Sequence, residues 1–217
     1  MADRKLSPWS RMLFPMMAKF RRARAELILS QFPGIGAMKV LDLGGSTHFW
    51  DTVYDRIQPA ELTILNIAHD GTSVSATRGD DRFRIELYDG TRVPADEGQY
   101  DLVICNSVIE HVPINSRQHL VDEIRRVGKH YMVQTPAHEF ILEPHFLAPA
   151  IHWLPRGFGR KFVGLTPFAL MHRHHDMDEM FDEIRLLQRD EFKRFFPEGT
   201  LHVERFAGMP KSYVMTA

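Results

Sequence analysis

The sequence lacks the marks of several protein classes. It holds one cysteine, Cys105, so an internal disulfide cannot form and a reducing compartment is favoured. No apolar run reaches the ~18 residues of a membrane-spanning helix, and the first residues lack the apolar core of a secretion signal. The formal net charge is -1, so no overall field attracts nucleic acid. We therefore expect a cytoplasmic protein that does not bind nucleic acid.

Residues 1–33 differ from the rest of the chain because basic residues cluster there. After Pro15, apolar residues from Met16 to Ile28 recur at helical spacing, and Pro33-Gly34 ends the pattern. This predicts an amphipathic helical segment with one apolar and one basic face. In one interpretation it packs on the domain edge with its arginines solvated; in the other it is a lid or makes peripheral contact with a membrane surface. The arginines concerned are Arg21, Arg22 and Arg24.

Residues 34–217 alternate between short apolar segments and amphipathic ones, which predicts a parallel sheet with helices on both faces. Helices are expected at residues 46–57 and 115–127. The segment Tyr100–Asn106 is apolar throughout and therefore favours a central strand. The five expected strands are Lys39–Leu43, Leu62–Ile67, Phe83–Leu87, Tyr100–Asn106 and His130–Gln134.

The pattern changes after Pro136. Residues 137–175 mix large apolar side chains with prolines and histidines, and we expect an insertion over the carboxyl edge of the sheet whose aromatic residues, such as Trp153, form core. Helices follow near residues 178–187 and 189–196. The last two strands, at 201–206 and 212–215, flank a tight turn. The fold class is thus α/β: a doubly wound, mostly parallel seven-stranded sheet with an antiparallel terminal hairpin strand.

Four strand ends carry polar residues suited to a nucleoside-containing ligand, since these ends share one edge of a doubly wound sheet. Asp42 and the turn Gly44-Gly45 follow the first strand, and a helix opens at Ser46. Asn66 ends the second strand, Asp89-Gly90 the third and Asn106-Ser107 the fourth. Asp42 could hold an ammonium group, Asn66 ribose hydroxyls and Asp89 an exocyclic amine.

The order VLDLGG, LTILN, YDGTRVP and YDLVICNSVIEHV resembles the class I S-adenosylmethionine-dependent methyltransferases, in the small-molecule branch, over roughly residues 38–135. The resemblance implies a Rossmann-like methyltransferase fold with S-adenosylmethionine as cofactor. It also implies that different strand ends bind the methionine part, the ribose and the adenine of the cofactor. The implied cofactor-binding residues are Asp42, Gly44, Gly45 and Ser46 near the methionine part, Asn66 at the ribose, Asp89 and Gly90 at the adenine, and Asn106 near the amino group.

The sequence departs from the family pattern at three positions. Ser46 and His48 replace the second and third glycines of the first loop, and Asn66 replaces the acid that ends the second strand. One alternative is therefore a methyltransferase-like fold kept as a non-catalytic binding or scaffold module. A nicotinamide dehydrogenase would need G-x-G-x-x-G after the first strand, which is absent.

The candidate catalytic residues are three histidines: His111, His138 and His145. His111 lies where the resemblance places the border of the cofactor, and His138 and His145 follow the fifth strand, together with Glu139 and Glu143. A base is needed only if the methyl acceptor is a hydroxyl. The histidines near Asp176 lack a spaced set of partner ligands, so we expect a solvated loop and no metal site.

The expected function is methyl transfer to a small-molecule, lipid-linked or glycan acceptor. An acceptor would approach between residues 1–33 and the insertion, because the cofactor is expected to occupy the ends of the first four strands. Both segments combine large apolar side chains with cations, which suits an anionic, amphipathic acceptor.

Overall fold

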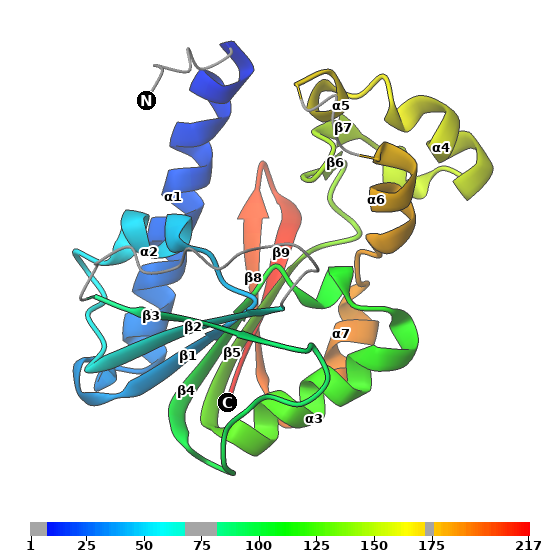
Figure 1. Cartoon of the computed structure of the whole chain (residues 1–217). Coiled ribbons are helices and arrows are strands. Elements are labelled where there is room, and N and C mark those ends of the chain that lie inside the picture. The colour runs from blue at the N-terminus through cyan, green and yellow to red at the C-terminus, as the bar shows by residue number, and fades with distance from the viewer. Residues whose placement is uncertain (1–7, 68–81, 172–175) are drawn as a thin grey trace.

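The computed structural model describes residues 8–67, 82–171 and 176–217. They form a seven-stranded sheet in the order β3-β2-β1-β4-β5-β9-β8, in which only β9 runs antiparallel to its neighbours (Figure 1). The expected fold class is confirmed. The strands are β1 (Lys39–Leu43), β2 (Glu61–Ile67), β3 (Arg84–Tyr88), β4 (Tyr100–Asn106), β5 (Gly128–Pro136), β8 (Thr200–Phe206) and β9 (Met209–Thr216).

Helices cover both faces of the sheet, and alternate residues of each central strand supply the two cores. Leu41 and Val103 pack with α3 (Arg117–Val127) and α7 (Arg189–Phe195). Val40 and Leu102 pack on the other face with α1 (Pro8–Gln31) and α2 (Thr47–Val53). Burying one such aliphatic side chain contributes roughly 1.5–3 kcal/mol. The period-two pattern therefore fixes which way each strand residue points.

Asp42 lies on the same face as Val40, toward α1 and α2, and this places its carboxylate in an apolar core. The bounds of β1 and β4 agree with the sequence prediction, whereas α2 is shorter than expected. β5 is longer than expected at both ends, because Gly128 pairs with Tyr100 of β4 and because Thr135 and Pro136 pair with β9. Asp101 is the second residue of β4, and its carboxylate accepts from the Lys39 amide at 2.9 Å and from Lys129 Nζ at 2.7 Å.

α1 begins at Pro8 and continues through Pro15, so the helix starts earlier than the sequence predicts. Its basic residues divide into two kinds. Arg22 is exposed, but Arg24 is only 5% exposed and forms a two-pronged ion pair with Glu204 on β8, with distances of 3.1 and 2.8 Å. The expectation of a fully solvated arginine face is thus wrong for Arg24, because its partner lies on a strand at the other end of the chain.

The insertion rises beside α1 over the carboxyl edge of the sheet, with the β8–β9 hairpin between them (Figure 1). It has a small core of its own, centred on Phe146, Val163 and Phe181. Three aromatic residues expected in a core are instead exposed: Trp153 by 46%, Phe158 by 58% and Phe162 by 51%. Its elements are β6 (Leu142–Glu143), β7 (Ala148–Pro149), η4 (Ile151–Trp153), α4 (Arg156–Val163) and α5 (Pro167–Met171), followed by α6 (Met177–Glu183).

Within the described residues, no helix is long and apolar enough to cross a membrane. The histidines at 172, 174 and 175, near which the sequence predicts a solvated loop, fall outside those residues. Asp70, an acid four positions after Asn66 that could substitute for the acid missing at that strand end, also falls outside them.

Candidate functional site

The turn after β1 requires glycine at two successive positions. Gly44 has φ = +73°, and a Cβ there would lie 2.5 Å from the Val108 side chain. A Cβ on Gly45 would lie 1.8 Å from the Asp42 carboxylate. The Gly44 amide donates to the Leu65 carbonyl at 2.8 Å, which ties the turn to β2. The turn is therefore folded directly over the carboxylate.

Asp42 is 1% exposed and only half satisfied. Its Oδ2 accepts from Trp50 Nε1 at 2.7 Å, whereas Oδ1 has no hydrogen-bond partner among the described residues. Burial raises the pKa of Asp42 to about 7, and the Trp50 hydrogen bond only partly opposes this. A buried carboxyl with one unmatched oxygen favours a cationic ligand, which would both lower its pKa and complete its hydrogen bonding.

A pocket of about 430 Å³ opens above this carboxylate, between α1 and the insertion. Five of the predicted cofactor-binding residues line it: Asp42, Gly44, Gly45, Ser46 and Asn106. The other walls are apolar side chains of α1, α2 and the insertion, namely Phe20, Phe49, Phe140, Leu142 and Leu147. The pocket thus joins a polar floor at the strand ends to an apolar upper part.

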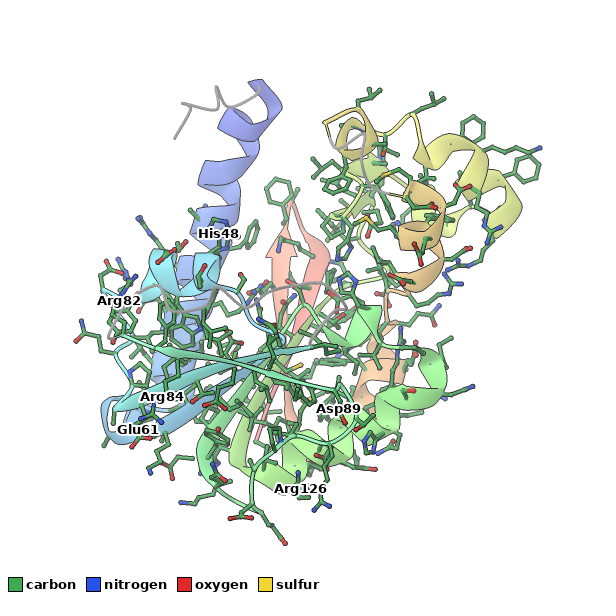
Figure 2. The ribbon with its side chains drawn as sticks, in the orientation of Figure 1. His48, Glu61, Arg82, Arg84, Asp89 and Arg126 are labelled. Atoms are coloured by element: carbon green, nitrogen blue, oxygen red, sulfur yellow. The ribbon has the colours of Figure 1, made fainter. Side chains whose placement is uncertain are left out.

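The remaining predicted cofactor-binding residues, Asn66, Asp89 and Gly90, do not line this pocket. Asn66 Nδ2 donates to the Gly45 carbonyl at 3.1 Å and so braces the glycine turn. Asp89 is exposed at the end of β3, where hydrogen bonds from Thr91 lower its pKa (Figure 2). Because β3, β2 and β1 are adjacent, these residues continue the same edge of the sheet, away from the insertion.

Among the described residues, three cations line the pocket: Arg21 and Arg24 of α1, which the sequence offers for the acceptor side, and Lys211 of β9, which it does not. Arg24 Nη1 donates to Asn106 Oδ1, so the side chain that the resemblance assigns to the amino group already has a partner. Lys211 Nζ lies 3.7 Å from Glu204 and 4.1 Å from the centroid of the Phe20 ring. Burial lowers the pKa of Lys211 to about 8, against the opposing charge of Glu204.

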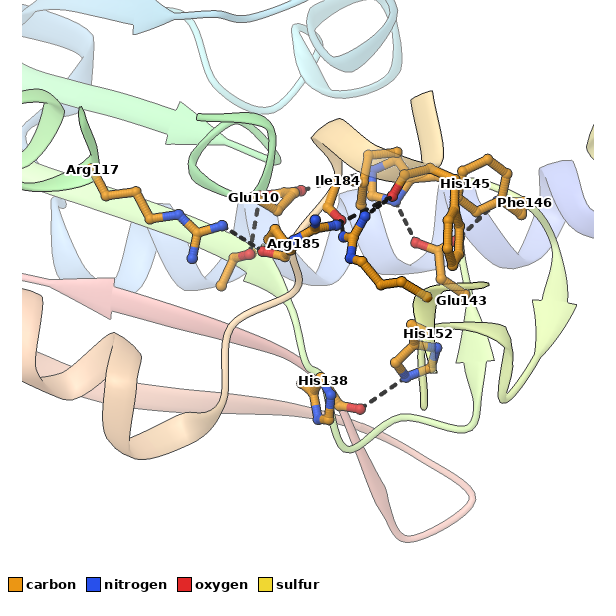
Figure 3. Close-up of polar contacts among 12 residues, drawn as sticks. Glu110, Arg117, His138, Glu143, His145, Phe146, His152, Ile184 and Arg185 are labelled. Atoms are coloured by element: carbon orange, nitrogen blue, oxygen red, sulfur yellow. Dashed lines mark hydrogen bonds and ion pairs between the residues drawn. The ribbon is translucent and has the colours of Figure 1, made fainter. Parts of the chain in front are cut away.

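Two of the three candidate histidines come together. The rings of His111 and His145 are 4.8 Å apart, and His145 lines the pocket. His138 lies elsewhere, where its carbonyl accepts from His152 Nε2 at 2.9 Å and Trp153 Nε1 at 2.8 Å. Figure 3 shows Glu110, Glu143 and His145 in one group and His138 with His152 in another.

The two nearby acids also differ in role. Glu139 accepts from Tyr213 Oη at 2.8 Å and from the Arg189 amide at 3.1 Å, so it holds structure together and is not placed to act as a base. Glu143 Oε1 lies 2.6 Å from His145 Nδ1, and its Oε2 accepts from the Phe146 amide at 2.7 Å. Glu143 therefore orients the histidine at the pocket.

Residues 41–131 match the family model described as methyltransferase domain. No curated protein matches the sequence significantly. Magnesium protoporphyrin IX methyltransferase from Synechocystis PCC 6803, solved with bound SAH, is similar over 99% of this chain and 89% of its own, with a TM-score of 0.60 and 9% identity.

Two further solved structures agree. A SAM-dependent methyltransferase from Aquifex aeolicus has a TM-score of 0.53 and 11% identity, covering 89% of this chain and 88% of its own. An S-adenosylmethionine-dependent methyltransferase from Mesorhizobium loti has a TM-score of 0.54 and 13% identity, covering 88% and 95%. At these identities the structures show the fold, and the family match shows the domain. Residues 41–131 are thus similar to a methyltransferase domain, and the chain has the Rossmann-like fold of the class I methyltransferases, a family whose cofactor is S-adenosylmethionine.

Proposed function

We infer that the protein transfers a methyl group from S-adenosylmethionine to an acceptor that has an apolar body and an anionic group. The observation that carries this inference is the unmatched, buried Oδ1 of Asp42, held beneath a glycine turn at the floor of a pocket with apolar walls. The methionine ammonium of the cofactor is a cation of the kind that this oxygen lacks.

The proposed cofactor position follows the carboxyl edge of the sheet. Asp42, Gly44, Gly45 and Ser46 would surround the methionine part, since they line the pocket floor. The nucleoside would extend toward the ends of β2 and β3, where Asn66, Asp89 and Gly90 lie. Asn106 would contribute together with Arg24, to which it is bonded. The pairing with Arg24 makes Asn106 a less independent ligand than the resemblance implies.

The cofactor supplies an activated methyl group, so the chain must chiefly align the acceptor with it and exclude water. The walls formed by Phe20, Phe140 and Leu147 would exclude water around the reacting atoms. His145 is the histidine best placed to take a proton from a hydroxyl acceptor, because it lines the pocket and Glu143 fixes its ring. His111 adjoins it, whereas His138 is not placed for this role.

The acceptor chemistry is proposed from the upper part of the pocket. Arg21 and Lys211 provide positive charge among apolar side chains, which favours a carboxylate or phosphate on an apolar carrier. A small molecule, a lipid-linked intermediate and a glycan phosphate all share this chemistry. Peripheral membrane contact through residues 1–33 would serve the lipid-linked case, and the exposed Phe158 and Phe162 place further apolar surface on the insertion.

The competing function is a scaffold that keeps the fold without the cofactor. A thermal-shift and calorimetric titration with S-adenosylmethionine and SAH separates the two. Ligand at ~100 times its dissociation constant should add ~2.7 kcal/mol to the stability of the catalytic form. Asp42→Ala should weaken binding by ~2–3 kcal/mol, since it removes a charged hydrogen bond.

Asp101→Asn is the matched control, because Asp101 is an acid at the opposite end of a neighbouring strand and bonds only to Lys39 and Lys129 in the contacts described. It should bind the cofactor as the wild type does. If neither ligand stabilises the wild type at millimolar concentration, the scaffold function stands. Incubation with labelled cofactor and phosphorylated or carboxylated acceptors of each class then identifies the acceptor.

A further inference from the structure

We propose that Glu110, His111 and His145 form a binding site for a divalent transition metal, with Zn²⁺ as the ion that fits best. Glu110 and His111 belong to the short 3₁₀ helix η2 (Ile109–His111), which follows β4, and His145 belongs to the insertion. The site therefore joins the insertion to the sheet edge at the pocket. The sequence predicts no metal site, because the third ligand lies 34 positions after the second.

The ligand atoms are already close to a coordination geometry. One oxygen of Glu110 and one ring nitrogen from each histidine all lie within 4.8 Å of one another. Glu110 Oε1 and His145 Nε2 are 3.9 Å apart. Two ligands at ~2.1 Å from a tetrahedral zinc are ~3.4 Å apart, so closure of about 1 Å would complete the set. Small side-chain rotations suffice for this, and the backbone need not move.

An independent observation at Glu110 points to a missing cation. Glu110 is 0% exposed; its Oε2 accepts from Thr135 Oγ1 at 3.0 Å, but Oε1 has no hydrogen-bond partner among the described residues. Such an orphaned buried oxygen is costly unless something binds it. The nearby Arg117 guanidinium is engaged by Glu191 at 3.1 Å and by the Arg185 carbonyl at 2.6 Å, so it does not fill the gap.

The outer contacts of the histidine also suit metal binding. His145 Nδ1 donates to Glu143 Oε1 at 2.6 Å, and this leaves Nε2 as the unprotonated nitrogen on the Glu110 side. Metal-bound histidines commonly use this carboxylate contact to fix the ring and its tautomer. The Glu110 backbone is held too, because its carbonyl accepts from the Arg185 amide at 2.8 Å.

The donor set selects the class of ion. Two imidazoles and one carboxylate form the three-ligand set of catalytic zinc sites, which leaves a fourth position open. Calcium and magnesium prefer oxygen-only sets. His145 lines the pocket and His111 is exposed, so an ion can enter and its open position can take water or an oxygen ligand. With the ion bound, both ring nitrogens of His145 are occupied, so the ion's open position would replace His145 as the group that acts on a hydroxyl acceptor. That role rests on the proposed function, whereas binding of the ion does not.

Without metal, a protonated His145 could bridge Glu110 and Glu143 in the same space. Burial lowers the pKa of His145, but the hydrogen bond and charge of Glu143 and the charge of Glu110 raise it overall. This ion pair is the competing explanation for the geometry. It predicts no specific metal affinity, so a direct binding measurement distinguishes the two.

The test uses the full chain after treatment with EDTA and dialysis. Calorimetric titration with ZnCl₂ should show one tight site, and CoCl₂ should give the intense visible absorption of a four-coordinate ion. His111→Ala should abolish the tight site, and its exposed position makes unfolding an implausible cause. Glu110→Gln should also abolish it, and Glu143→Gln should weaken it by ~10–100-fold.

His138→Ala is the matched control, since that histidine is near in sequence but outside the cluster, and it should leave the tight site unchanged. This control matters because the chain has 12 histidines that could bind zinc weakly. Wild-type protein without a one-to-one site, or a site that survives in His111→Ala and Glu110→Gln, would overturn the proposal. Cofactor binding is measured on the same samples, so loss of the metal site and loss of the methyltransferase activity are separate results.

Discussion

Two buried carboxyls lie at or near the pocket, Asp42 at its floor and Glu110 beside His145, which lines it, and each has one oxygen bonded and one without a partner among the described residues. Asp42 accepts from the Trp50 indole and Glu110 from the Thr135 hydroxyl. The difference lies in their surroundings. Asp42 lies beneath a glycine turn at the floor of the pocket, whereas Glu110 faces two imidazoles. Each unmatched oxygen would therefore be satisfied by a cation, but by a different one. Asp42 suits an ammonium group, and Glu110 suits a metal ion.

The largest expected effect concerns protonation of these two carboxyls in the ligand-free protein. Burial raises the pKa of Asp42 from 3.8 to about 7, and it also raises the pKa of Glu110. Between about pH 4 and pH 7 the unfolded chain has lost the Asp42 proton while the folded chain retains it. The folded state then binds more protons, so the free energy of unfolding falls as pH rises, by up to ~4 kcal/mol for Asp42.

Urea unfolding across this pH range checks the prediction. Asp42→Asn should remove the decrease in the free energy of unfolding with pH that is due to Asp42. Glu110→Gln should remove only the decrease that is due to Glu110. If the free energy of unfolding of Asp42→Asn depends on pH as that of the wild type does, Asp42 is already ionised in the folded state. The comparison of Asp42 with Glu110 as two buried carboxyls with raised pKa values would then fail.

The contrast between the sheet edge and the insertion also shows what the sequence can predict. Asp42, Gly44 and Gly45 can be predicted because they lie at the end of a buried strand or directly after it, where local order fixes their position. The burial of Arg24 could not be predicted, because it depends on Glu204, which lies 180 positions later. No local sequence pattern indicates a contact between residues so far apart in the chain. An arginine on the apolar side of a helix nevertheless indicates that its side chain is buried with a partner.

The insertion is harder to predict because its chain path is irregular. His138 and His145 looked equivalent in the sequence, yet only His145 reaches the pocket. Between them and after them the chain turns sharply, and Leu147 and Ala150 have positive φ values of 54° and 57°. Such conformations are disfavoured for these residue types and are held by packing, so they leave no sequence signal. The strands and the fold class could be predicted, but not the histidine pair.

A smaller effect is expected from Gly45→Ala, which should impair cofactor binding at Asp42 but not metal binding at Glu110. The new Cβ would lie 1.8 Å from the Asp42 carboxylate, so the turn or the carboxylate must move. We expect a loss of stability of ~1–3 kcal/mol and loss of cofactor binding, by analogy with overpacked cores. Zinc binding at Glu110 should persist in the same variant.

Gly164→Ala is the matched control, because a Cβ there meets nothing within 4 Å. It should leave stability and both binding activities close to wild type, as measured by thermal unfolding and calorimetry. Cofactor affinity retained in Gly45→Ala would show that the ligand does not use the space above Asp42.

The smallest effect concerns Asn66, which braces the turn by donating to the Gly45 carbonyl at 3.1 Å. Asn66→Asp removes this donor and sets a carboxylate against the carbonyl oxygen, so cofactor affinity should fall by ~1 kcal/mol. Asn66→Ala removes the bond without adding charge, and the difference between the two variants in calorimetric affinity isolates the repulsion. Tighter binding by Asn66→Asp would contradict this account: the acid usual at this strand end would then be bonding ribose, and the glycine turn over Asp42 would not depend on its brace.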